Sequence, residues 1–314
     1  MIQLSRRASL RLAASVSLLA AAPARGQCVA TVAGPCDEGG GRAAGQAQTV
    51  AANALLGGLT AGMMRVAHGG RFGGAFVRGA AGGALVYAGK RTVVHRFYGA
   101  GLLGRQIASV GSSVSYNAAA GTGALDRLML PVGPVRVYVS PRGRRTVHVR
   151  VDAATLATLG YVALRRDNAF DLSATLSTGA PVFRHYATPG QVDWEGAQVA
   201  GVVQLRHAPY ERTPGVVVSA AVREYVDDVA AHERVHVLQY DQSFLLWSAP
   251  AEDGILQPSR AGRALHRWVD LGLNLPLWAA LNEAVGHRER PWEREAYFLS
   301  RSSPEQIGGR PDRR

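Results

Sequence analysis

Pairs of glycines at helical spacing recur in the first third of this 314-residue sequence. Gly58 and Gly62 lie four residues apart, and so do Gly79 and Gly83. This spacing puts the small residues on one face of a helix, where a second backbone can approach closely. The uncharged run over residues 48–64 is shorter than the roughly 20 residues that span a bilayer. We therefore expect closely packed helices, or a helical hairpin resting on a membrane, in preference to a membrane span.

Residues 1–26 have the pattern of an export signal. A basic start with Arg6, Arg7 and Arg11 precedes an apolar centre, and small residues at Ala24 and Gly26 suit a cleavage site. The Arg6-Arg7 pair is compatible with the twin-arginine route, which exports folded chains, and with the general secretory route. The sequence thus predicts a protein of the periplasm, the cell envelope or the exterior.

The composition is that of a globular protein with a basic balance. With 47% hydrophobic and 18% charged residues, this length excludes a disulfide-dense mini-protein, a collagen-like repeat and a charge-rich disordered chain. Loss of the signal removes four arginines from a net charge of +12, which leaves 12 − 4 = +8. Lys90 is the only lysine, and arginine suits carboxylate or phosphate partners, although GC-rich coding gives the same composition. Because aromatic and basic residues are not interleaved, no nucleic-acid partner is expected.

The two cysteines, Cys28 and Cys36, lie at the start of the exported chain. In an oxidising compartment they are expected to form a local disulfide around Gly34 and Pro35. A lipid anchor on Cys28 is the alternative, but the small apolar run that lipoprotein signals place before the cysteine is missing.

Alternating apolar residues indicate short strands in the middle of the chain. Val135–Val139 and residues 146–151 flank a turn and predict a β-hairpin. Further strands are expected over 170–176, 182–185, 199–205 and 215–218. Strands ahead of a helix-rich end indicate an α+β fold. We expect a signal peptide over 1–26, a glycine-rich region over 27–133 and a domain of antiparallel strands followed by helices over 134–314.

The motif with the clearest chemistry is His-Glu-x-x-His, from His232 to His236, inside a helical pattern over residues 219–244. Histidines at positions i and i+4 lie one above the other, so both imidazoles can reach one ion. Glu233 then lies beside the ion, where it can accept a proton from water instead of acting as a ligand. Two surface histidines on an ordinary helix are the alternative.

A catalytic zinc ion takes three protein ligands, and three later glutamates are candidates for the third. Glu283 lies in an Asn-Glu-Ala segment, within an expected helix over 276–285, that is similar to the ligand segment of thermolysin-like enzymes. Glu293 and Glu295 lie on a helix that Pro291 opens. They point to different faces, so they cannot both bind the ion. For Glu295, an exposed pairing with Arg294 or Arg290 is the expected role. Another helix is expected over 259–273.

The segment from His232 to Gln239 (HERVHVLQ), followed by Pro-Trp-Glu-Arg-Glu-Ala-Tyr from Pro291, resembles the gluzincin metallopeptidases. It is similar to little-characterised bacterial domains with an HExxHxxQ helix and a later Pro-aromatic-Glu-x-Glu-Ala segment, over residues 199–302. In the larger group, which includes the CAAX-type membrane proteases, the third ligand is usually the glutamate three residues before the alanine. The resemblance therefore implies Glu293. Many relatives place an aspartate that orients a histidine ligand where this chain has Tyr297.

The resemblance implies an α+β, zincin-like metallopeptidase that uses Zn²⁺ and acts on a peptide or protein substrate. Glu233 would act as general base on a water activated by the ion. Candidates for stabilising the oxyanion or orienting a ligand are Tyr240, Tyr297, His266 and His287. The strand over 199–205 could offer an edge to an extended substrate.

A second hypothesis belongs to a different class. The protein could be a non-enzymatic envelope protein whose glycine-rich segment mediates membrane association or assembly. The motif would then hold a structural zinc ion or none. Glu233 separates the two hypotheses, because a structural site has no use for an adjacent general base.

Overall fold

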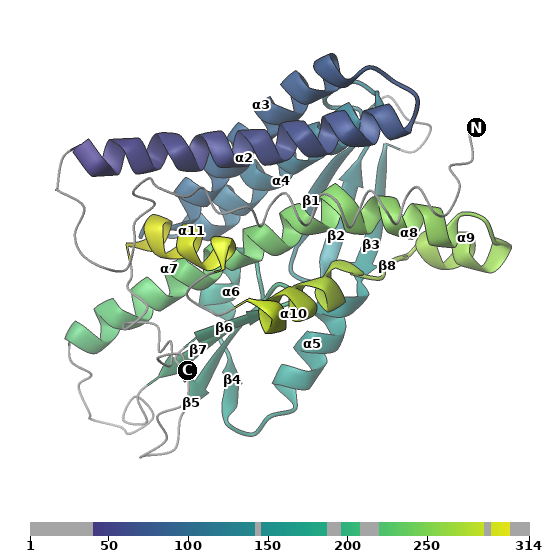
Figure 1. The fold of residues 1–314 in the computed structure, drawn as a ribbon. Coiled ribbons are helices and arrows are strands. Elements are labelled where there is room, and N and C mark those ends of the chain that lie inside the picture. Colours follow the sequence, from purple (N-terminus) through teal and green to yellow (C-terminus); the bar gives the residue numbers. More distant parts are fainter. Residues whose placement is uncertain (1–39, 142–145, 187–195, 208–219, 286–289, 302–314) are drawn as a thin grey trace.

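Helices and two small mixed sheets make up the described part of the chain, which confirms the α+β class (Figure 1). The computed structural model describes residues 40–141, 146–186, 196–207, 220–285 and 290–301. The expected signal peptide, Cys28, Cys36 and the strand over 215–218 lie outside the described residues.

Three glycine-rich helices form one layer: α2 (Gly40–Ala67), α3 (Phe72–Val93) and α4 (Ala100–Ala120). The close packing expected from the glycines is confirmed. A Cβ atom on Gly83 of α3 would lie 2.0 Å from the carbonyl oxygen of Asn53 on α2. One on Gly111 of α4 would lie 2.5 Å from the carbonyl oxygen of Gly82. Only glycine permits these backbones to lie so close together.

Part of α2, Gly45–Ala67, is by length and composition able to cross a membrane, and part of it is buried within the structure. On the face towards α3, Gly58 and Gly62 contact the rings of Phe76 and Phe72. These glycines therefore accommodate aromatic side chains, whereas Gly79 and Gly83 accommodate backbone.

The first sheet has the order β1-β2-β3-β8, with β1 (Leu128–Val132), β2 (Val135–Val139), β3 (Val147–Asp152) and β8 (Val269–Asp270). The expected hairpin is confirmed as the antiparallel pair β2–β3. The parallel pairing of β3 with β8 shows that the sheet is mixed, whereas only antiparallel strands were expected. The boundary expected between residues 133 and 134 falls in the turn between the paired strands β1 and β2.

The second sheet has the order β4-β5-β7-β6 and is also mixed, because β5 and β7 are parallel. Its strands are β4 (Asn168–Phe170), β5 (Val182–Tyr186), β6 (Gly196–Val199) and β7 (Val202–His207). Helix α5 (Ala153–Ala163) precedes β4. The strand expected over 170–176 is wrong, since Asp171 caps helix α6 (Leu172–Thr178) through a bond from the Ala174 amide. The strand expected over 199–205 is a hairpin, because Ala200 and Gly201 have positive φ and reverse the chain.

The long helix α7 (Ala220–Ser243) runs through the middle of the molecule and confirms the helix expected over 219–244 (Figure 1). It packs against β6, β7, α3, α4 and α11 (Pro291–Ser300). Among the described residues, the largest core cluster joins α3, β7, α7 and α11 through Val86, Val93, Val203, Leu205, Val235, Leu238 and Leu299. Helices α3 and α4 and the second sheet therefore share one core with the helix that carries the histidines.

The chain leaves α7 through a π-helix, η2 (Phe244–Ser248), and α8 (Ala249–Leu256). The helix expected over 259–273 is shorter, because α9 (Arg260–His266) is followed by β8. Helix α10 (Asn274–Ala284) corresponds to the helix expected over 276–285, and α11 begins at Pro291 as expected.

Candidate metal centre

The two histidines of the motif lie on α7 and direct their Nε2 atoms to the same point. His232 Nε2 and His236 Nε2 are 2.9 Å apart, and the ring centroids are 4.6 Å apart with the planes at 79°. Their i, i+4 spacing on a regular helix brings the two rings together in this edge-to-face arrangement. His232 is 1% exposed, so the point lies inside the molecule.

Glu293 reaches the same point from α11. Pro291 stands in the first turn of this helix, where its fixed φ favours the helical start, two residues before Glu293. Glu293 Oε2 lies 3.2 Å from Nε2 of His232 and 3.2 Å from Nε2 of His236. Two imidazole nitrogens and one carboxylate oxygen from two helices thus meet at one place.

These separations fit a tetrahedral zinc site. Ligand atoms about 2.0–2.1 Å from a zinc ion lie roughly 3.3–3.4 Å from one another at tetrahedral angles. The three atoms here are 2.9–3.2 Å apart. Two imidazoles and one carboxylate are also a common set of ligands for a catalytic zinc ion, which keeps a fourth position for water or substrate. His232, His236 and Glu293 are therefore residues that could hold zinc.

The charges of the site shift one another's pKa values. Burial raises the pKa of Glu293, but the charge of His236 and hydrogen bonds to both histidines hold it well below its usual range. Burial lowers the pKa of His236, but the charge and hydrogen bond of Glu293 outweigh this and raise the pKa to about 9. The site therefore favours an ionised carboxylate facing a positive charge.

Glu233 is buried beside these residues, with 3% of its surface exposed. Burial raises the pKa of its carboxyl to about 7; the charge of His236 opposes the increase, and that of Glu293 adds to it. A carboxylate with a pKa close to neutral is suited to take up and return a proton.

Gln239, one helical turn after His236, fixes the orientation of that histidine. The Gln239 amide nitrogen Nε2 donates to the carbonyl oxygen of Trp292 at 3.0 Å and to Oε2 of Glu295 at 2.8 Å. Because both partners are acceptors, the amide oxygen Oε1 is the atom that faces Nδ1 of His236, at 2.7 Å. When His236 loses a proton to bind a metal ion, the proton that remains is therefore the one on Nδ1, and the lone pair of Nε2 points to Glu293 and His232. This is the tautomer that a metal ligand at Nε2 requires.

Glu295 does not contribute an atom to the point where the two histidines and Glu293 meet. We expected it to be an exposed partner of a neighbouring arginine, and this is wrong as well. Its carboxylate accepts hydrogen bonds from Lys90 Nζ at 2.8 Å and from Asn53 Nδ2 at 2.6 Å. Two residues along α11 from Glu293, it points to another helix face, towards α2 and α3. The expectation failed because these helices cover that face.

The structure describes the side chains of only some of the remaining candidates for the third ligand and for the orienting groups. Glu283 lies on α10, but its side chain is outside the described part of the structure, as is His287 altogether. The Tyr297 ring packs on His232, with ring centroids 4.5 Å apart. Tyr297 therefore contacts a candidate ligand directly through its ring.

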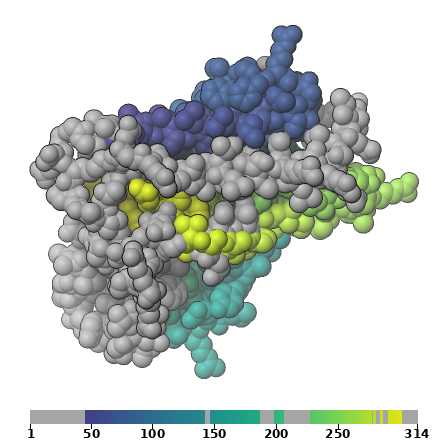
Figure 2. Space-filling model, in the orientation of Figure 1, coloured from purple at the N-terminus to yellow at the C-terminus, as the bar shows by residue number. Residues whose placement is uncertain are grey.

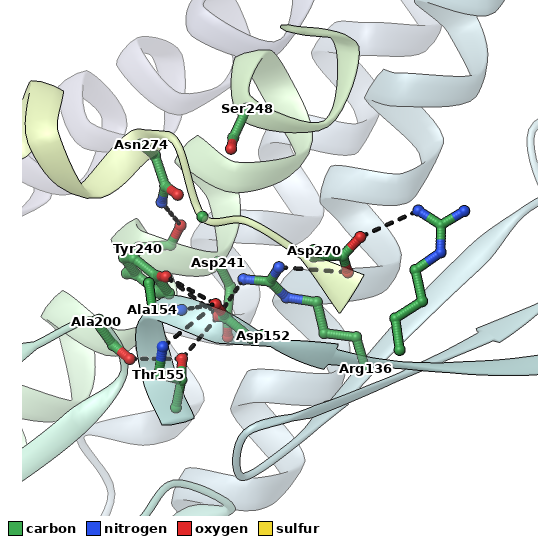
Figure 3. Close-up of polar contacts among 12 residues, drawn as sticks. Arg136, Asp152, Ala154, Thr155, Ala200, Tyr240, Asp241, Ser248, Asp270 and Asn274 are labelled. Atoms are coloured by element: carbon green, nitrogen blue, oxygen red, sulfur yellow. Dashed lines mark hydrogen bonds and ion pairs between the residues drawn. The ribbon is translucent and has the colours of Figure 1, made fainter. Parts of the chain in front are cut away.

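Tyr240 points into a different polar network (Figure 3). Its hydroxyl donates to Oδ2 of Asp152 at 3.1 Å, and Asp152 also accepts from the backbone amides of Ala154 and Thr155 at the start of α5. Arg136 forms a close ion pair with the same carboxylate. These contacts give Tyr240 a role in joining α7 to the first sheet.

A second group of acidic and histidine side chains, Glu252, His266 and Asp270, lies close together within the described residues. Glu252 accepts hydrogen bonds from the backbone amides of residues 271 and 272. Asp270 accepts from Tyr138 and Arg150. His266 bonds with Asp253 at 2.8 Å. Because these donors already engage the oxygens, the group serves as a buried polar network, and His266 lies there and not with His232 and His236.

Sequence reasoning missed two residues near the site, Lys90 and Asn53, which come from the glycine-rich helices. A signal was present in the composition, because Lys90 is the only lysine among 35 basic residues. Comparison of the chain with family models, curated proteins and solved structures gives no significant match.

Proposed function

We propose that the protein is an exported zinc metallopeptidase that hydrolyses peptide bonds. The observation that carries the proposal is the meeting of His232 Nε2, His236 Nε2 and Glu293 Oε2 at 2.9–3.2 Å, beside the buried Glu233. The arrangement of α7 against β6 and β7, with a glutamate from a later helix, supports a zincin-like fold.

Each residue of the site has a defined part in this proposal. When bound, zinc supplies a Lewis acid that polarises the peptide carbonyl and makes an attacking water more acidic. His232 and His236 hold the ion through Nε2 and Glu293 holds it through a carboxylate oxygen. Glu233 accepts the proton of the attacking water and returns it to the leaving amine. Their burial strengthens these electrostatic effects, because little water screens them.

The second sheet offers a place for an extended substrate. Among the described strands, β6 is at the edge of the sheet, whereas β7, which we expected to share that edge, is inside it. Helix α7 packs against both strands. A peptide that adds to the edge of β6 would form main-chain hydrogen bonds close to the helix that carries the ligands.

The decisive experiment measures zinc content and peptide hydrolysis for the same samples. The wild-type chain should bind one zinc ion and cleave members of a broad peptide library. Glu233→Gln should retain the ion but lose hydrolysis by about 10²–10⁴-fold, since it keeps the shape of the side chain and loses the base.

Asp228→Asn is the matched control, because it makes the same change on the same helix outside the site. Asp228 pairs with the exposed Arg96 at 3.4 Å, and its loss should leave both zinc and hydrolysis unchanged. Full zinc occupancy with no cleavage of any library peptide would refute the enzymatic proposal and leave a structural site in a non-enzymatic envelope protein.

A further inference from the structure

The only lysine of the chain is buried at the junction of the glycine-rich helices and α11. The side chain of Lys90 is 2% exposed. Its ammonium group donates to Oδ1 of Asn53 on α2 at 2.9 Å and to Oε2 of Glu295 on α11 at 2.8 Å. Burial removes water from the ammonium group, which costs free energy unless hydrogen-bond partners and an opposite charge replace that water. Because Glu295 supplies the opposite charge, its position beside Lys90 is tightly defined.

The contacts continue from Lys90 to the candidate metal centre without a gap. Glu295 Oε2 accepts from Lys90 and from Gln239 Nε2, both at 2.8 Å, and Gln239 Oε1 lies 2.7 Å from Nδ1 of His236. Asn53 donates from Nδ2 to Glu295 Oε1 at 2.6 Å and to the carbonyl oxygen of Thr49 at 2.9 Å.

The direction of each hydrogen bond in this series follows from the chemistry of the groups. Lysine can only donate, and an ionised carboxylate can only accept. The Gln239 amide nitrogen therefore points to Glu295 and its oxygen points to His236. A change at Lys90 is thereby linked to the proton on Nδ1 of His236.

We propose that Lys90 is a positioning residue for the metal centre. Through Glu295 and Gln239 it fixes the tautomer and orientation of His236, so the glycine-rich helices complete the site. This inference rests on the proposed function, because it takes His236 as a zinc ligand. It adds a role for helices that the sequence assigned only to packing or membrane contact.

The packing of the glycine-rich helices explains why Lys90 and Asn53 lie side by side. Gly83, seven residues before Lys90, lets the backbone of α3 approach the carbonyl oxygen of Asn53 on α2. Helix α2 also lies along α11, as Figure 1 shows and the bond from Asn53 to Glu295 confirms. Purple α2 and yellow α11 appear on one face of the molecule in Figure 2.

The test is the zinc affinity of the full-length chain, measured by competition with a chelator and without any substrate. Lys90→Met should weaken zinc binding by about 10-fold or more, the range seen when groups behind a metal-binding histidine are lost. The visible spectrum of the Co²⁺-loaded chain should also change, because the orientation of His236 changes. Lys90→Arg, which keeps the charge, should recover most of the affinity.

Arg105→Met is the matched control. Arg105 of α4 is 2% exposed and binds Asp241 of α7, with Nε to Oδ2 at 2.6 Å, and the carbonyl oxygen of Gly179; within the described part of the chain its hydrogen bonds go to these two residues and not to His236 or Gln239. Its loss should lower the melting temperature as Lys90→Met does while zinc affinity changes by less than about threefold.

A double variant tests whether the effects pass through Gln239. Gln239→Leu alone should weaken zinc binding by about 10–100-fold. Adding Lys90→Met to it should change the affinity by less than about twofold, because the series is already interrupted. If Lys90→Met does not fold, Lys90→Met with Glu295→Gln removes both buried charges and should show the same loss of affinity.

The proposal would be overturned if Lys90→Met folded and kept the zinc affinity of the wild-type chain, or if Arg105→Met lost as much affinity as Lys90→Met. It would also be overturned if the loss of zinc affinity in the double variant equalled the product of the losses caused by Lys90→Met and Gln239→Leu alone. The readout separates this failure from that of the proposed function. A chain that binds zinc in a Lys90-dependent way and cleaves no peptide refutes the peptidase and leaves the role of Lys90 intact.

Discussion

Glu293 Oε2 on α11 lies 3.2 Å from Nε2 of His236 on α7, although 57 residues separate the two in the sequence. The intervening segment includes β8 and α10, which return the chain so that α11 packs against α7. The site is therefore formed only when the tertiary fold is complete. The alternatives for its third ligand differ in a property that can be measured directly.

We predict that Glu293→Ala abolishes stoichiometric zinc binding, because it removes one of three ligands. Glu295→Gln should retain one zinc ion per chain with lower affinity, since Glu295 acts only through Gln239. The zinc content per chain, measured after dialysis against a weak chelator, distinguishes Glu293→Ala from Glu295→Gln. Glu283→Ala serves as a further control, and loss of zinc from that variant alone would show that the third ligand is Glu283.

Zinc affinity should increase with pH because His236 must lose a proton to bind the ion. Without metal, the pKa of His236 is about 9, chiefly because Glu293 offsets the effect of burial. Between pH 7 and 8.5 the dissociation constant should fall by about tenfold per pH unit, as expected for release of one proton. Competition titrations with a chelator of known pH dependence measure this slope, and a flat profile would contradict the raised pKa.

The same pKa predicts how the metal-free chain depends on pH. The pKa of about 9 in the folded chain lies above the usual histidine pKa of 6.5, so His236 stabilises the fold fully below pH 6.5. This contribution is lost as the pH rises through 9. Urea unfolding in the presence of a chelator measures the free energy of unfolding at pH 6 and at pH 9.5. This free energy should decrease more between the two pH values for the wild-type chain than for His236→Gln. The comparison with the variant cancels the effect of the other titrating groups. Equal decreases in both chains would refute the prediction.

The local features of the site could be predicted from the sequence, whereas its long-range contacts could not. His232 and His236 are four residues apart on one helix, and Pro291 marks the start of another, so each signal is contained in a short segment. Two partners of Glu295, Lys90 and Asn53, are 205 and 242 residues away along the chain. No periodicity in α11 indicates which helix covers that face, and an exposed position was the natural expectation.

The errors in the fold also have local causes. Asp171 and Gly179 delimit α6, through a side-chain cap at one end and a residue with positive φ at the other. These signals outweighed the β-type pattern of residues 170–176. Ala200 and Gly201 both adopt positive φ, which produces a two-residue turn where the sequence suggested a continuous strand.

Arg136 should be essential for stability, because it neutralises two buried carboxylates (Figure 3). It pairs with Asp152 and lies 3.4 Å from Asp270, and its guanidinium stacks on the Phe244 ring. Arg136→Met should lower the free energy of unfolding by about 3–5 kcal/mol, as when a buried ion pair loses one member. Equilibrium urea unfolding measures the change.

The control for this prediction is Arg96→Met. The Arg96 side chain is 66% exposed in its pair with Asp228, so its loss should cost about 0–1 kcal/mol. Equal effects of the two substitutions would show that the network around Arg136 contributes no more than a surface ion pair.

The glycine packing of α2 and α3 should control both stability and metal affinity. A Cβ on Gly83 would lie 2.0 Å from the carbonyl oxygen of Asn53, so Gly83→Ala has to push α2 away from α3. We expect a loss of about 1–3 kcal/mol in unfolding free energy from overpacking. Because Asn53 and Lys90 both bind Glu295, the same shift should weaken zinc binding severalfold.

Gly73→Ala tests the specificity of that effect on the same helix. Among the described residues, no atom lies within 4 Å of a Cβ at Gly73, so alanine there should be neutral or stabilise α3 by up to about 1 kcal/mol. Thermal unfolding and zinc competition on both variants provide the comparison. If Gly83→Ala lost stability but kept full zinc affinity, the glycine packing would support the fold alone, since the shift of Asn53 would not reach His236.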